Sequence, residues 1–217
     1  MATTLYRPVG LEELALIWDS GCREFPLRLP NQPIFYPVTS SEYAAQIARD
    51  WNTKATSFAG YVTSFNVDDE YLAKFERHIV GSTVHEEYWI PAEQVPSLNR
   101  AMRSLIHVES AFFADSFAGF IPERSGLKDK NAAEQFQILA RNLAFNRMDF
   151  VLEVSVNRKA VYLNCLFWTG RDLGNLRIGA EEKQATLSGV VEAWRYCKIA
   201  PGLPAVFLKA VQPNNES

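Results

Sequence analysis

The chain has 217 residues, 47% of them hydrophobic and 22% charged, which suits one large folded domain or two small ones. Its net charge of −3 lacks the basic excess of a general nucleic-acid-binding protein. The three cysteines, Cys22, Cys165 and Cys197, do not have the spacing of a disulfide framework or a zinc site. With no signal-peptide pattern and no long apolar run, we expect a cytoplasmic protein that spans no membrane and needs no metal.

The first third of the chain alternates between strand and helix patterns. Residues 5–9 predict a strand, residues 11–18 a helix, and residues 34–36 a short strand within a proline-rich loop. Thr39-Ser40-Ser41-Glu42 matches a capping box, which predicts a second helix over residues 43–51.

The middle of the chain predicts strands joined by short helices. In chain order, we expect a strand at 60–67, a short helix at 68–75, a strand near 79–80, a strand at 84–90, a helix at 92–100 and a strand at 105–113. A turn-rich passage at 120–126 then predicts a boundary. It separates a first domain, residues 1–120, from a second domain or extension, residues 125–217.

The second part of the chain opens with a predicted helix whose apolar face runs from Ala132 to Leu143. Residues 149–156 and 160–168 then alternate like paired strands across Asn157-Arg158-Lys159. An amphipathic helix follows at 181–196. Because regular βαβ alternation is absent, the chain predicts an α+β fold, with a C-terminal part that is itself α+β.

The segment from His85 to Pro91 carries the sharpest functional signal. Two carboxylates and an imidazole, from Glu86, Glu87 and His85, stand at the mouth of an aromatic-rich strand that stops at the proline. Charged side chains are rarely buried without a partner, so acids that lead into a core strand are candidates for chemistry. Since neighbouring strand residues alternate, we expect Glu87 to face a pocket and Glu86 to face solvent.

At this point the sequence resembles two groups of proteins. The first is a set of small bacterial proteins that carry the label "ADP-ribosylation/crystallin". The matching residues are Leu5-Tyr6-Arg7-Pro8-Val9-Gly10, Ser20-Gly21, Phe25-Pro26, Ile34-Phe35-Tyr36-Pro37-Val38 and Tyr88-Trp89-Ile90-Pro91-Ala92-Glu93. The second, more distant resemblance is to the ADP-ribosyltransferase superfamily, and together the two cover about half of the chain.

The superfamily pattern is an Arg on the first strand, a Ser, Thr or Tyr element after a helix, and a Glu before an apolar strand. The sequence matches it with Arg7, with the segment 36–40 and with Glu87, which begins a Glu-apolar-apolar-apolar-Pro run. The resemblance implies an ADP-ribosyltransferase-like mixed sheet core. It also implies that nicotinamide adenine dinucleotide (NAD) is the substrate and that a macromolecule accepts the ADP-ribose.

The resemblance further implies a role for each site residue. Glu87 would stabilise the oxocarbenium-like ribose, and His85, which stands where many members carry Glu or Gln, would act as a base. The cofactor-binding group would comprise Arg7, Tyr6, Tyr36, Thr39, Ser40 and Arg28, with guanidiniums for phosphate and aromatic rings for nicotinamide.

Other interpretations of the same residues remain open. Thr39 and Ser40 are also explained as helix caps, and Arg7 and Arg28 as surface charges. The scaffold would also suit a non-catalytic binding, adaptor or immunity-type protein with a protein partner. A third hypothesis puts the function in residues 125–217. The sequence predicts neither an acceptor nor an oligomeric state.

Overall fold

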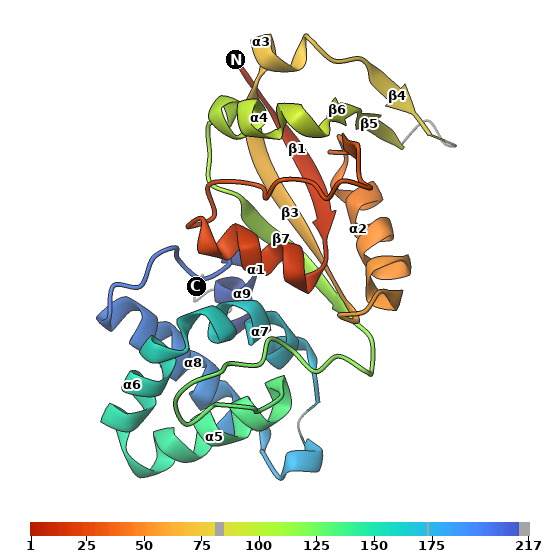
Figure 1. Cartoon of the computed structure of the whole chain (residues 1–217). Coiled ribbons are helices and arrows are strands. Elements are labelled where there is room, and N and C mark those ends of the chain that lie inside the picture. The colour runs from red at the N-terminus through yellow and green to blue at the C-terminus, as the bar shows by residue number, and fades with distance from the viewer. Residues whose placement is uncertain (81–84, 173, 213–217) are drawn as a thin grey trace, which may run out of the picture. The chain divides into compact units, whose positions relative to one another are not determined.

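The computed structural model describes residues 1–80, 85–172 and 174–212 (Figure 1). Contacts divide the chain into two compact units, Met1–Asp115 and Ser116–Ser217. The first unit combines strands with helices, whereas the described residues of the second form helices without any strand. The chain as a whole is therefore α+β, but the expectation of an α+β C-terminal part is wrong.

The first unit follows the predicted order of elements. Its strands and helices are β1 (Ala2–Val9), α1 (Leu11–Asp19), β2 (Ile34–Phe35), α2 (Ser41–Asp50), β3 (Ala59–Asp68), α3 (Asp69–Leu72), β4 (Arg77–Ile79), β5 (Glu86–Tyr88), β6 (Ile90–Pro91), α4 (Val95–Ala101) and β7 (His107–Phe113). Short 3-10 turns follow α2, at Asn52–Lys54, and precede α4, at Ala92–Gln94.

Strand β3 is the centre of the first unit. It pairs antiparallel with β1 on one side and with β7 on the other. Its first seven residues are all buried, because apolar side chains cover both of its faces. On one face, Val62 packs with Ala44 and Ala48 of α2. On the other, Phe65 packs edge-on against Phe25.

A short extended segment at residues 37–39 joins β1 to β5. Val38 exchanges both backbone hydrogen bonds with Tyr6, at 2.9 and 2.8 Å. On the other side of the segment, the backbone N–H of Tyr88 in β5 donates a hydrogen bond to the carbonyl of Pro37, at 2.9 Å. The bridges set Tyr6, Val38 and Glu87 in one row across neighbouring strands, so their side chains share a face. Residues far apart in the sequence thereby meet at one edge of the sheet.

Two local expectations in this unit are corrected. The strand predicted at 84–90 is divided: β5 pairs with β4, and β6 pairs with β2, while Val84 lies outside the described residues. The predicted capping box at 39–42 is also wrong. Ser40, not Thr39, caps α2 by accepting the backbone N–H of Tyr43 at 3.1 Å.

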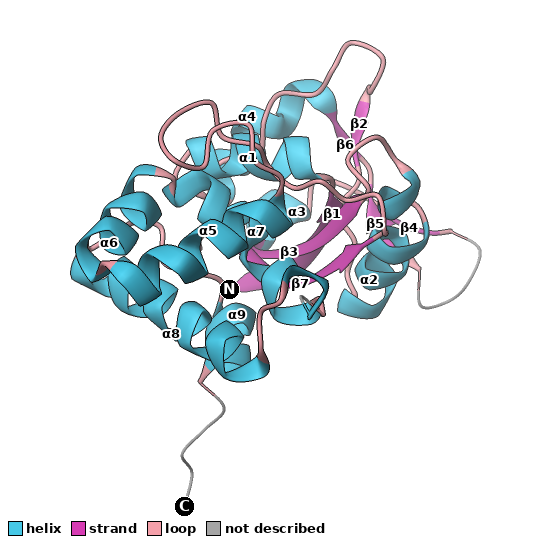
Figure 2. Ribbon diagram, turned by 90° about the horizontal axis from the view of Figure 1, so that it is seen from below, coloured by secondary structure: helices cyan, strands magenta, loops and turns pink. Residues whose placement is uncertain are grey.

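The second unit is a group of helices (Figure 2). They are α5 (Ala132–Phe145), α6 (Arg147–Val156), α7 (Arg158–Gly170), α8 (Ala180–Tyr196) and α9 (Ala205–Val211), with a 3-10 turn at Gly174–Leu176. Helix α7 is its buried centre, since all residues from Ala160 to Trp168 are buried. Asn164 of α7 donates to Gln135 of α5 and to the carbonyl of Phe120, which satisfies buried polar groups.

The strands predicted at 149–156 and 160–168 are helices α6 and α7, so that prediction is wrong. In α6, apolar residues occupy every second position from Met148 to Val156, which imitates a strand. In α7, side chains are buried on every side, so no helical period is visible. The predicted turn at Asn157 is a real break, but it joins two helices, ending α6 and beginning α7.

Candidate functional site

A hollow of about 500 Å³ in the first unit brings several predicted site residues together. It lies at the edge of the sheet, between the end of β1, the segment after β2, helix α2 and the start of β5. Its lining residues are Arg7, Pro8, Tyr36, Val38, Tyr43, Gln46, Ile47, Trp51, Val80, His85 and Glu87. Four predicted site residues therefore border one space: Arg7, Tyr36, His85 and Glu87.

Glu87 is the buried carboxylate of this hollow, with 9% of its surface exposed. One carboxylate oxygen, Oε1, accepts the indole N–H of Trp89 at 2.7 Å. Within the described part of the chain, no hydrogen bond reaches the other oxygen. A buried carboxylate retains a strong need for hydrogen-bond donors, so the second oxygen can bind hydroxyl groups of a ligand.

Aromatic rings stand around this carboxylate. His85 stacks on Tyr43 of α2, with 4.1 Å between ring centroids, and its Nδ1 lies 3.2 Å from the carbonyl of Val80. Trp89 stacks on His78 at 4.2 Å and meets Tyr36 edge-on at 6.0 Å. These contacts fix the orientation of the side chains beside the hollow.

The electrostatics of Tyr43 reflect the same neighbourhood. Partial burial, together with the negative charge of Glu87, raises the pKa of Tyr43 above its ordinary value. The phenol therefore keeps its proton at neutral pH. A neutral phenol can donate a hydrogen bond to a ligand without adding charge to the site.

Arg7 borders the hollow, but its guanidinium is already engaged. Its Nε and one terminal nitrogen donate to the two carboxylate oxygens of Glu13, at 2.9 and 3.3 Å. The other terminal nitrogen donates to the carbonyl of Tyr36 at 3.3 Å, and the group lies over the ring of Phe35. The geometry thus ties the position of Tyr36 to that of the arginine.

Arg28 also contacts the carboxylate of Glu13, but it does not line the hollow. One of its terminal nitrogens lies 3.4 Å from Glu13, while its buried Nε has no hydrogen-bond partner among the residues that the structure describes. Burial, followed by the nearby charge of Arg7, lowers the pKa of Arg28. Two guanidiniums therefore share one carboxylate, which leaves the cluster with one excess positive charge.

The remaining predicted residues lie elsewhere. Thr39 turns to the other side of β5, where its hydroxyl is 3.4 Å from the carboxylate of Glu86. Ser40 is used as the cap of α2. Tyr6 packs with the apolar cluster under α2 and borders a separate shallow hollow. None of these three side chains lines the hollow of Glu87.

Several lining residues were missed by the sequence prediction. Tyr43 and Ile47 lie on α2, and Trp51 follows its last residue; the three are spaced four residues apart and line the same hollow. That spacing was visible in the sequence and could have suggested an aromatic wall. Trp89, which donates to Glu87, lies two residues after it, and that spacing in an extended chain places both side chains on one side, so this contact too could have been suggested from the sequence.

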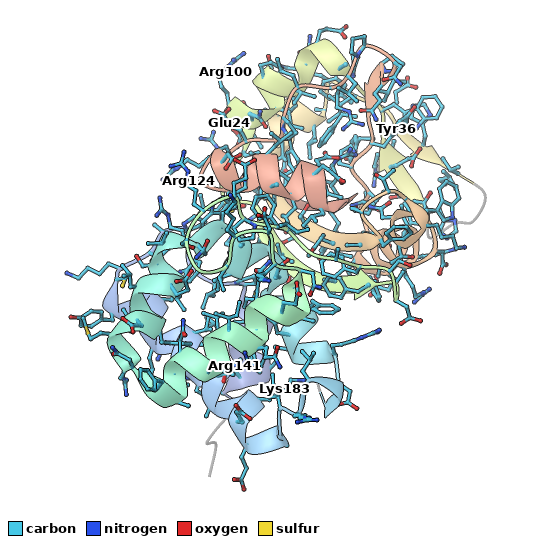
Figure 3. All side chains as sticks on the ribbon, turned by 60° about the horizontal axis from the view of Figure 1, so that its bottom comes forward. Glu24, Tyr36, Arg100, Arg124, Arg141 and Lys183 are labelled. Atoms are coloured by element: carbon cyan, nitrogen blue, oxygen red, sulfur yellow. The ribbon has the colours of Figure 1, made fainter. Side chains whose placement is uncertain are left out.

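A second, larger hollow in the first unit has a different character. Its volume is about 950 Å³, and its lining includes three arginines and Glu24. Figure 3 labels two of these side chains, Glu24 and Arg100. Arg103 there is paired with Asp68, and Arg100 donates to Ser97. This hollow holds no buried carboxylate, so the combination of a buried acid and aromatic rings favours the hollow of Glu87 as the candidate site.

Among residues 1–80, 85–172 and 174–212, no group of three or more His, Cys, Asp or Glu side chains is arranged to hold a metal ion. Within those ranges, no helix has both the length and the apolar character needed to cross a bilayer. No protein-family model, curated protein or solved structure matches this chain. A functional assignment therefore depends on the geometry of the hollow.

Proposed function

We propose that the protein is an NAD-consuming transferase with an ADP-ribosyltransferase-like core, which passes ADP-ribose to a macromolecular acceptor. One observation carries the proposal: a buried glutamate, a histidine and two tyrosine rings from separate elements border the same hollow, with Arg7 at its edge. The order of Arg7, the 36–40 segment and Glu87 along the chain also supports it.

The chemistry begins with breakage of the bond between nicotinamide and ribose. Nicotinamide leaves with the bonding electrons, and the ribose carbon becomes oxocarbenium-like. The Glu87 carboxylate faces that positive charge. Its oxygen that does not accept from Trp89 accepts hydrogen bonds from the ribose hydroxyls. A preorganised charge in a water-poor site is typically worth about 3–4 kcal/mol in the transition state.

The acceptor then attacks the ribose carbon and loses a proton. In this proposal His85 takes that proton. Its Nδ1 has a carbonyl partner, which favours a proton on Nδ1 and leaves Nε2 with the lone pair of a base. Tyr36 and Tyr43 provide flat surfaces for the nicotinamide ring. We also propose a cytoplasmic location, consistent with Cys22, Cys165 and Cys197 forming no disulfide with one another.

Release of nicotinamide from labelled NAD tests this function. Wild-type protein should release it, and Glu87→Gln should be slower by about a hundredfold to a thousandfold, because the amide keeps the shape but not the charge. Glu86→Gln is the matched control, since that neighbouring carboxylate contacts Thr39 and Arg77 instead, and it should keep the wild-type rate. Absence of turnover by wild type, or equal rates for the two variants, would refute the proposal.

One observation favours an alternative, a non-catalytic binding or adaptor protein on the same scaffold. The guanidinium of Arg7 is held by both oxygens of Glu13, so it is less available to a phosphate. In that case, NAD would leave the melting temperature unchanged, while a protein partner would co-purify in stoichiometric amount.

A further inference from the structure

Helix α6 of the second unit has two apolar faces. Phe150 and Val154 are buried and point into the helical core. On the opposite face, Met148, Leu152 and Val156 are 67%, 62% and 51% exposed. These three residues, here called the α6 stripe, are four positions apart and so form one line along the helix. Nothing in a monomer requires that line to be apolar.

The apolar surface extends beyond α6. Phe145, two residues before the helix, is 92% exposed, and Tyr196 at the end of α8 is 74% exposed. Met148 and Tyr196 border the same shallow hollow of about 290 Å³, so α8 continues the surface of the stripe. The exposed Arg147–Glu192 ion pair lines the same hollow. Single exposed apolar residues are ordinary, but a line of three along one helix, with two further exposed aromatic residues near its start, favours an interaction surface.

We propose that the α6 stripe is the self-association surface of this protein, and that its occupant is the same stripe of a second copy. This inference concerns the second unit and does not rest on the proposed function of the first. The stripe is symmetric in spacing about Leu152. In an antiparallel pair with a two-fold axis at Leu152, the larger Met148 therefore meets the smaller Val156 of the other copy at both ends.

The charges at the ends of α6 suit the antiparallel arrangement. The N-terminal end carries Asp149, which is exposed, while the charge of Arg147 is neutralised by Glu192 at 2.6 Å. At the C-terminal end, the guanidinium of Arg158 folds back to donate to the carbonyl of Ser155 at 3.4 Å. In an antiparallel pair, the acidic N-terminal end of α6 in one copy lies beside the basic C-terminal end of α6 in the other. The two helix dipoles then point in opposite directions, which is favourable.

The size of the surface is sufficient for association. A standard stable interface buries about 800 Å² on each partner, with aromatic side chains at its centre. The α6 stripe with Phe145 and Tyr196 presents five large side chains, each more than half exposed. Aromatic residues bury about 150–250 Å² each in contacts of this type, so Phe145 and Tyr196 together supply about 300–500 Å², and the three aliphatic side chains of the α6 stripe add to that area.

Sedimentation equilibrium of the full chain is the first test. Wild type should approach twice the 24.5 kDa chain mass at micromolar concentration. Leu152→Glu places a charge from each copy at the axis and should weaken association by about a hundredfold. Leu29→Glu is the matched control, because Leu29 is 60% exposed in the first unit, and it should leave the mass unchanged.

Crosslinking tests the geometry. In a background with Cys197→Ser, oxidised Leu152→Cys should form a covalent dimer, because the two positions face each other across the axis. A mixture of Met148→Cys and Val156→Cys should crosslink to each other more than either does alone, which a parallel pair would not produce.

A wild-type chain that stays monomeric at every concentration would overturn the proposal, whatever else binds the stripe. Equal masses for Leu152→Glu and wild type would overturn it too. Crosslinking of Leu29→Cys as readily as Leu152→Cys would show that the reaction reports collision and not an interface.

Discussion

Glu86 and Glu87 show what a sequence can predict at the scale of single residues. Strand alternation placed them on opposite sides of β5, and the structure has Glu87 in the hollow and Glu86 beside Thr39 and Arg77. Alternation is local, so it can be inferred without knowing the fold. The same alternation places the indole of Trp89 on the side of Glu87, but the sequence alone did not single out their hydrogen bond.

Arg7 shows the limit of the same reasoning. The sequence motif placed Arg7 first in the order of site residues, ahead of Glu87. The structure has Arg7 at the border of the hollow. Its pairing with Glu13 crosses from β1 to α1, and that contact depends on how the helix packs. The sequence therefore predicted that Arg7 and Glu87 border one hollow, but not that Glu13 occupies the guanidinium.

The Arg7–Glu13–Arg28 cluster leads to a stability prediction. Glu13→Gln removes the only negative charge of the cluster and leaves two largely buried guanidiniums facing each other. Breaking a buried ion pair on one side costs about 3–5 kcal/mol, and the lower end applies because a fifth of the Glu13 side chain remains exposed. Urea denaturation should show a loss of about 3 kcal/mol in the free energy of unfolding.

The neighbouring acid provides the control for that measurement. Glu12 lies on the same turn of α1 but is exposed, so Glu12→Gln should change the free energy of unfolding by less than about 0.5 kcal/mol. If both variants lose the same stability, the cluster does not stabilise the fold as described.

At the scale of elements, the close approach of α2 to β3 supports one wall of the candidate site. A Cβ atom on Gly60 would lie only 2.1 Å from the carbonyl oxygen of Ala48, so the helix backbone rests directly on the strand. Gly60→Ala must push α2 away and should reduce the free energy of unfolding by about 1–3 kcal/mol. Gly202→Ala, with nothing within 4 Å, should cause no loss.

Thermal unfolding of both glycine variants checks this packing. Because α2 also carries Tyr43 and Ile47, Gly60→Ala should disturb the hollow as well as the stability. A Gly60→Ala protein that is as stable as wild type would mean that α2 does not approach β3 as closely as described.

Helices α6 and α7 explain why part of the fold could not be predicted. A strand and a helix with two apolar faces leave the same every-second-residue pattern, and only tertiary packing tells them apart. In α6 the second face is the exposed stripe through Leu152. In α7 burial on all sides removes the period altogether. Elements with one apolar face, such as α1, α5 and α8, were predicted from their spacing.

At the scale of the whole molecule, each unit contains its own core. The first has the Phe25, Phe35 and Phe65 cluster, and the second has Phe136 packed near Trp168. We therefore expect residues 1–115 and 116–217 to fold when expressed separately. Cooperative thermal unfolding of each fragment would support this expectation. A fragment that unfolds without a cooperative transition would show that its core is incomplete.

A structure of the chain in complex with NAD tests the central claim most directly. The account predicts the nicotinamide ring between Tyr36 and Tyr43, with a ribose hydroxyl at about 2.6–3.2 Å from the free oxygen of Glu87. An empty hollow at saturating NAD, or a nucleotide bound on another surface of the chain, would contradict it.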